Sequence, residues 1–92
     1  MVTAIVLIKS EKDQVPELAQ NIADMKGVSE VFSVAGRYDL VAVVKVSQMD
    51  DIADVISNAM RKQEGILETE TLIAFRAFSQ NEMEVGFDLG LD

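Results

Sequence analysis

The sequence contains no cysteine, no histidine and no tryptophan. Without cysteine, the chain has neither a disulfide framework nor thiolate chemistry, and a reducing compartment is allowed. Without histidine, it lacks the commonest general base and metal ligand. A glycine-rich phosphate loop and a nucleophile–base–orienter set are also missing. We therefore expect no catalytic residues, no metal and no cofactor.

Positive charge is scarce, since eight Lys and Arg face sixteen Asp and Glu, for a net charge of −8. The basic residues are scattered, whereas phosphate binding requires clusters of them, so direct nucleic-acid binding is not expected. The apolar run Val2 to Ile8 has no basic leader and is too short to span a bilayer. It is interpreted as a strand, with no membrane segment and a cytoplasmic location.

The chain is short but rich in apolar residues. Its 92 residues make one domain with a small core, near the size at which surface exposure limits stability. Hydrophobic residues nevertheless make up 49% of the sequence. This surplus indicates apolar surface that is buried against another copy of the chain.

Periodicity and turn residues predict six elements in the order β-α-β-β-α-β. Pro16 falls in the first turn of the first helix, and Gly27 and Gly65 end the two helices. A shift of 38 residues superposes the two halves, with Gly27 falling on Gly65. The expected elements are a strand at 2–9, a helix at 14–25, strands at 28–35 and 39–46, a helix at 50–63 and a strand at 66–78.

This order predicts an α+β, ferredoxin-like fold with a four-stranded antiparallel sheet and two helices on one face. Right-handed crossovers place the first and third strands in the centre. Both central strands are apolar on both faces, but the helices can cover only one. We therefore expect a homodimer that packs the open sheet faces together. In the second strand, Val28, Phe32 and Val34 are expected on one side.

The last residues form a separate segment. Residues 1–79 are interpreted as the domain and residues 80–92 as a tail in which apolar and acidic or glycine residues alternate. Such a tail is either a solvated terminus or an arm that docks on a neighbouring subunit.

A compact polar set, Gly36, Arg37, Tyr38 and Asp39, occupies the turn between the second and third strands. In a structural interpretation, Gly36 supplies a positive φ and Asp39 accepts hydrogen bonds from turn N–H groups. In a binding interpretation, Arg37 and Asp39 contact the two ends of an amino acid beside an aromatic wall from Tyr38. On these residues alone the structural interpretation is the simpler one.

Thr69 and Thr71 are two residues apart, so their hydroxyls project from the same face of the last strand. Strand propensity alone explains them. If they were buried among apolar neighbours they would need hydrogen-bond partners, such as a small zwitterion. The neighbouring acids Glu68 and Glu70 are interpreted as edge-strand charges that discourage aggregation.

The Val-x-Gly-x-Tyr-Asp-Leu pattern at 34–40, followed by Glu-Thr-Glu-Thr at 68–71, resembles the Lrp/AsnC effector-binding domain. This domain is also called the RAM domain, an ACT-like βαββαβ module, and the resemblance covers residues 2–78. It implies pairing through the sheets, assembly of dimers into rings, and binding of amino-acid effectors between dimers. The ligand-binding residues it implies are Gly36, Arg37, Tyr38, Asp39, Thr69 and Thr71.

The strand order adds a geometric expectation. The second and fourth strands lie on opposite edges, so the loop and the two threonines should be far apart within one subunit. A ligand that touches both would then bridge subunits. Val55 and Ala59 of the second helix are expected to add an apolar wall to that site.

The resemblance is incomplete at one end. Lrp/AsnC regulators carry a helix-turn-helix domain before this module, whereas here the first strand begins at residue 2. A stand-alone amino-acid-binding and oligomerisation module is therefore expected, which acts through partners such as full-length regulators. The alternatives are a small dimeric α+β-barrel enzyme, such as a monooxygenase, and a purely structural interaction module.

Overall fold

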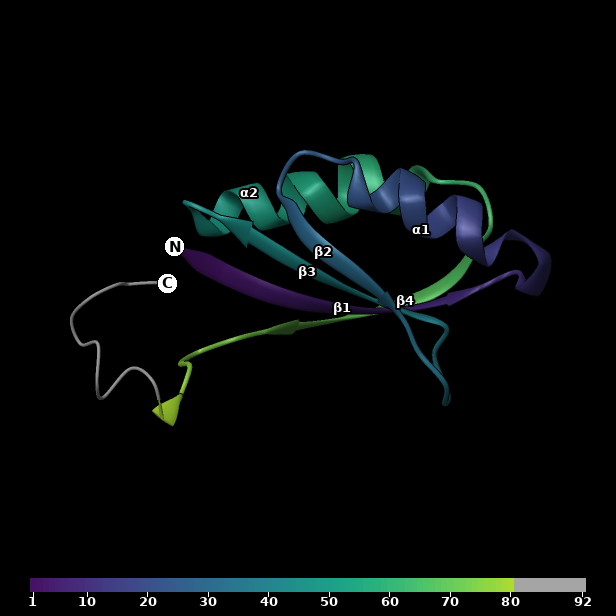
Figure 1. The fold of residues 1–92 in the computed structure, drawn as a ribbon. Coiled ribbons are helices and arrows are strands. Elements are labelled where there is room, and N and C mark those ends of the chain that lie inside the picture. Colours follow the sequence, from purple (N-terminus) through teal and green to yellow (C-terminus); the bar gives the residue numbers. More distant parts are fainter. Residues whose placement is uncertain (81–92) are drawn as a thin grey trace.

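The computed structural model describes residues 1–80. A four-stranded antiparallel sheet has the order β2-β3-β1-β4, which confirms the predicted topology. Both helices cover the same face of this sheet (Figure 1). The strands are β1 (Val2–Ser10), β2 (Val28–Ser33), β3 (Leu40–Val46) and β4 (Ile66–Ile73).

The first helix, α1 (Val15–Ala23), follows a short 3₁₀ turn, η1 (Lys12–Gln14). The second helical segment begins as α2 (Met49–Ala53), continues as a π-helical turn, η2 (Asp54–Ala59), and ends in a 3₁₀ turn, η3 (Met60–Lys62). Its total span agrees with the predicted helix to within one residue. None of the helices in residues 1–80 is long and apolar enough to cross a membrane.

The core lies between the sheet and the helices, and its residues follow the internal duplication. Ala4 and Val6 of β1 superpose on Ala42 and Val44 of β3 after the 38-residue shift, and all four are fully buried. The helices contribute Leu18 and Ile22, and then Ile52, Val55, Ile56 and Met60. The two halves therefore build one core with the same pattern.

Strand β2 differs from its predicted facing. Val28 pairs with the buried Val44, whereas Phe32 pairs with Val41 on the opposite face. A register shift between Val28 and Glu30 inserts one residue into β2, and such a bulge reverses the side-chain alternation. The prediction that Val28 and Phe32 share a side is therefore wrong.

Strand β4 ends at Ile73, five residues before the predicted end at 78. One further ladder bond joins the Ala74 N–H to the Thr3 carbonyl at 2.9 Å. Beyond it the chain leaves the sheet, and Phe75 and Phe78 are exposed. Residues 81–92 of the tail at 80–92, for which a solvated terminus and a docking arm were the alternatives, lie outside the described residues.

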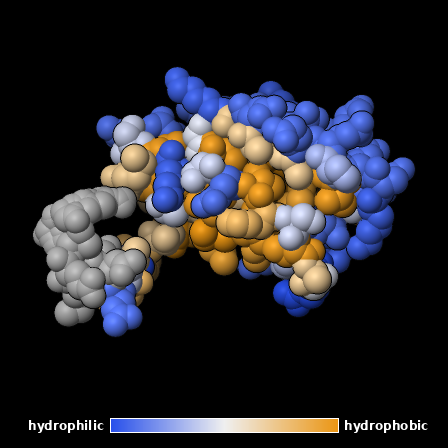
Figure 2. Space-filling view, in the orientation of Figure 1, coloured by the Kyte–Doolittle hydropathy of each residue, from blue (hydrophilic) through white to orange (hydrophobic). Residues whose placement is uncertain are grey.

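The sheet face opposite the helices, here called the open face, carries Ile5, Leu7, Val41 and Val43 in cross-strand register. The exposed side chains of Phe32 and Leu72 flank them on the edge strands. Figure 2 shows apolar surface along the sheet, below a hydrophilic layer over the helices. The predicted apolar open face is therefore present in the subunit.

Candidate functional site

The loop between β2 and β3 projects from the sheet on the side opposite the helices (Figure 1). The Val34 N–H donates to the Asp39 carbonyl at 3.0 Å and closes its base. Gly36 has a φ of +146°, and no atom lies within 4 Å of the place a Cβ would take. The glycine is therefore required by backbone conformation and not by crowding.

Asp39 fastens the loop to the end of β1. Its N–H donates to the Ile8 carbonyl at 2.8 Å. Its Oδ2 accepts the Ser10 N–H at 2.9 Å, and its Oδ1 lies 3.1 Å from Lys12 Nζ in an ion pair. The Ser10 hydrogen bond, followed by the contact with the Lys12 ammonium group, holds the pKa of Asp39 below its usual value. Both carboxylate oxygens are therefore engaged within the subunit.

Tyr38 extends the loop across the open face to β4. Its hydroxyl donates to Glu70 Oε1 at 2.6 Å, and the Arg37 guanidinium lies over its ring, 5.7 Å from the centroid. Lys9 Nζ donates to the Arg37 carbonyl at 2.9 Å. The loop thus reaches the strand that carries the two threonines, and the expectation that it lies far from them within one subunit is wrong. The loop is attached to β1, and because β1 is adjacent to β4, the loop can contact β4.

The two threonines of β4 lie on the face of the sheet that the helices cover, opposite to the face that Tyr38 contacts. Thr69 pairs with Ile8 and Thr71 pairs with Val6, whose side chains are buried on the helix side. Glu70, which Tyr38 contacts, pairs with Leu7 on the open face. The loop and the threonines are thus close along β4 but lie on opposite faces of it. Thr71 is exposed and Thr69 half-buried, so neither hydroxyl is enclosed in the isolated subunit.

Two hollows border this part of β4. The first, here called the loop hollow, has a volume of about 340 Å³ and is lined by Lys9, Arg37, Tyr38 and Glu68. The second, the threonine hollow, measures about 650 Å³. Glu68 borders both. The threonine hollow is lined by Ile56, Ser57, Arg61, Ile66, Leu67, Glu68, Thr69 and Thr71.

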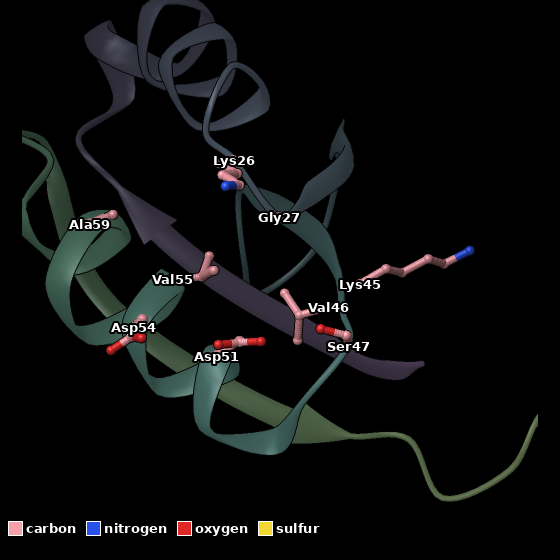
Figure 3. A pocket seen from close by; sticks show the side chains of 9 residues that line it. All are labelled: Lys26, Gly27, Lys45, Val46, Ser47, Asp51, Asp54, Val55 and Ala59. Atoms are coloured by element: carbon pink, nitrogen blue, oxygen red, sulfur yellow. The ribbon is translucent and has the colours of Figure 1, made fainter.

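The expected apolar wall lies elsewhere. Val55 and Ala59 line a third pocket, of about 600 Å³, together with Gly27 and Val46 at the opposite end of β3 from the loop (Figure 3). In the threonine hollow the helical segment instead presents Ile56 and Ser57. Within one subunit, Val55 and Ala59 therefore do not lie beside the loop and the threonines, and their place in a site between subunits stays a prediction.

Lys9 and Glu68 line the loop hollow, but neither was assigned to a site from the sequence. They are cross-strand partners on the open face of β1 and β4. The register between β1 and β4 would have identified Glu68, because the residue that pairs with Lys9 must lie on the same face of the sheet. That register was not available from the sequence, and Glu68 was interpreted only as an edge-strand charge.

Tyr38 is the single tyrosine of the chain, so tyrosinate absorbance reports on this contact alone. The hydrogen bond to Glu70, and then burial, raise the pKa of Tyr38 above its ordinary value of 10.0. Because the folded-state pKa is raised, the bond's contribution to stability is present below pH 10.0 and is lost as the pH rises through the folded-state pKa. We expect Glu70→Gln to move the absorbance midpoint down toward that of free tyrosine. Glu30→Gln, an exposed change on β2, should leave it in place, and equal midpoints for all three proteins would refute the contact.

Comparison with known proteins identifies the group to which this arrangement belongs. Residues 3–83 match the sequence model of the Lrp/AsnC ligand binding domain. The uncharacterized HTH-type transcriptional regulator PH1916 of Pyrococcus horikoshii is 34% identical over 76 residues. That match covers 79% of this chain and 51% of the regulator, so the chain spans about half the length of this relative.

Two solved structures have the same fold. TTHA0845 from Thermus thermophilus superposes with a TM-score of 0.82 at 42% identity, covering 87% of this chain and all of that one. The regulator NMB0573 of Neisseria meningitidis, solved as an L-Met complex, superposes with a TM-score of 0.76 at 12% identity, covering 86% of this chain and 53% of that one. The extent of the family match shows that this chain belongs to the Lrp/AsnC family and corresponds to its ligand binding domain.

Proposed function

We propose that the chain is a non-enzymatic module that binds an amino-acid effector and assembles with copies of itself. The observation that carries the proposal is the loop hollow, in which Arg37, Tyr38 and Glu68 surround one open space in a ligand binding domain. The Neisseria relative has methionine as its bound molecule, which supports an amino acid as the class of ligand.

The loop hollow has chemistry suited to a zwitterion. The guanidinium of Arg37 supplies planar paired donors for a carboxylate, and the Tyr38 ring supplies an apolar wall beside it. The contacts of Asp39 with β1 and of Tyr38 with β4 hold the loop backbone in place before a ligand arrives. This arrangement supports binding by charge and shape, and it requires no covalent step.

The open face supports assembly. Ile5, Leu7, Val41 and Val43 are only half-buried within one subunit, and covering each is worth about 1.5–3 kcal/mol. A second copy that packs its own open face against them forms a homodimer. In one subunit, the side of β4 that carries the threonines is open to solvent. A ring of dimers would bring further subunits to the two hollows beside β4.

A regulatory role then depends on partner proteins. The net charge of −8 disfavours DNA binding by this domain, whereas the PH1916 relative is named as an HTH-type regulator. We propose that the module acts in the cytoplasm and transmits effector binding to full-length regulators of its own family through the shared sheet interface.

Titration calorimetry with each of the common amino acids tests the proposal. At least one of them should bind saturably, and Arg37→Ala should weaken that binding about tenfold or more, because it removes a charge-assisted hydrogen bond. Arg76→Ala, outside both hollows, is the matched control and should bind as the wild type does. Failure of every amino acid to bind the assembled protein would refute the proposed function.

A further inference from the structure

An amino-acid ligand brings an ammonium group as well as a carboxylate, and the loop hollow must supply an anion for it. Three carboxylates lie near the loop: Asp39, Glu68 and Glu70. Asp39 uses both oxygens, on the Ser10 N–H and on Lys12. Glu70 accepts the Tyr38 hydroxyl at 2.6 Å. Among the described residues, only Glu68 of these three makes no hydrogen bond or ion pair.

Glu68 is also well placed. It borders the loop hollow together with Arg37, and it borders the threonine hollow on the other side of β4. The Tyr38 side chain lines the same loop hollow, and the negative charge of Glu68 helps to raise the pKa of Tyr38. The ammonium of its cross-strand partner Lys9 is directed to the Arg37 carbonyl. The Glu68 carboxylate therefore stays available to a ligand.

The Asp39 carboxylate, unlike that of Glu68, is poorly available to a ligand. Its side chain is 14% exposed, and its partners are the backbone of β1 and a lysine of η1. The low exposure restricts access to this carboxylate, and each of its oxygens already has a partner that holds the loop. Its carboxylate is therefore suited to positioning the loop, and not to contacting the ligand.

We propose that Glu68 binds the ammonium group of the effector and that Asp39 is a positioning residue. This inference rests on the proposed function and extends it to specificity. The ligand class it names is the free α-amino acid, with its carboxylate on Arg37 and its charged amine on Glu68. Derivatives that lack the positive charge should bind more weakly, because they lose the charge-assisted contact with Glu68.

The test compares the best-binding amino acid with the α-hydroxy acid that has the same side chain, in which a neutral hydroxyl replaces the ammonium group. Calorimetry on the wild type should favour the amino acid about tenfold or more. In Glu68→Gln this preference should largely disappear, because the charge that binds the ammonium group is gone. Glu64→Gln, an exposed acid outside both hollows, should keep it.

Asp39→Asn separates positioning from recognition. It should weaken the binding of the amino acid and of the hydroxy acid alike and leave the ratio of their dissociation constants unchanged. It should also shift the Tyr38 absorbance midpoint, because the loop is loosened. Loss of the preference in Asp39→Asn, or its retention in Glu68→Gln, would overturn the inference while amino-acid binding itself stands. If no amino acid binds the wild type, the proposed function and this inference fail together.

Discussion

Val43→Glu is expected to dissociate the protein into folded monomers. Val43 lies in the centre of the open face, paired with Ile5, and is half-buried within one subunit. In a face-to-face dimer, each copy would bury one uncompensated carboxylate, at a cost of about 3–5 kcal/mol. The dimer dissociation constant should therefore rise about 100-fold or more. Sedimentation velocity over a range of concentrations measures it.

Ala53→Glu is the matched control. It adds the same charge to an exposed position of α2 on the other side of the molecule. It should sediment as the wild type does, and circular dichroism should show both variants folded. A wild-type protein that remains monomeric at micromolar concentration, or a Val43→Glu variant that associates unchanged, would rule out the open face as the interface.

Gly27→Ala is expected to lower the free energy of unfolding by about 2–5 kcal/mol. Gly27 has a φ of +96°, where a side chain costs about 1–2 kcal/mol. A Cβ there would also lie 2.8 Å from Cγ2 of Val55, a β-branched residue of the core. Overpacking of this kind adds about 1–3 kcal/mol, because the neighbour cannot rotate away. The melting temperature should fall by about 10 °C or more.

The internal duplication supplies the control. Gly65, the counterpart of Gly27, has nearly the same φ of +98°, but a Cβ there meets Oε1 of Gln14 at 2.6 Å. That atom is the end of a flexible side chain, so Gly65→Ala should cost only the backbone term of about 1–2 kcal/mol. Urea denaturation at one protein concentration compares the two. Equal losses would show that the contact with Val55 does not constrain the helix.

The fold was largely predictable from the sequence because its signals are local and repeated. The apolar pattern of Ala4 and Val6 recurs at Ala42 and Val44, and the glycines that end the helices recur at Gly27 and Gly65. Each signal depends on residues a few positions apart. The strand order followed from the handedness of the two crossovers.

The facing of side chains was less predictable, because it depends on register. One inserted residue after Val28 moved Phe32 to the open face, and no residue in β2 signals that bulge. The end of β4 was overestimated for a related reason. Residues 74–78 have the composition of a strand, but β1 begins at Val2, so little of it remains to pair with the chain beyond Ala74, which still bonds to Thr3.

The candidate site was predictable in its residues and not in its geometry. The loop residues were identified from the sequence. Their position in the fold depends on the hydrogen bond of Asp39 to the backbone of β1 and on the contact of Tyr38, across β1, with Glu70 of β4. These contacts join positions 29 and 32 apart in the chain. From these contacts we infer that Asp39 positions the loop and that Glu68 is the carboxylate available to a ligand, which composition and spacing alone could not suggest.

We propose that an amino acid binds beside the β2–β3 loop, and Tyr38 is a direct probe of that binding. The chain has one tyrosine and no tryptophan, so fluorescence excited in the tyrosine absorption band comes from Tyr38 alone. Titration with the common amino acids should give a saturable change in that fluorescence for at least one of them, with the same dissociation constant as calorimetry. An amino acid that binds by calorimetry without any change at Tyr38, or no response to any of them, would contradict the account.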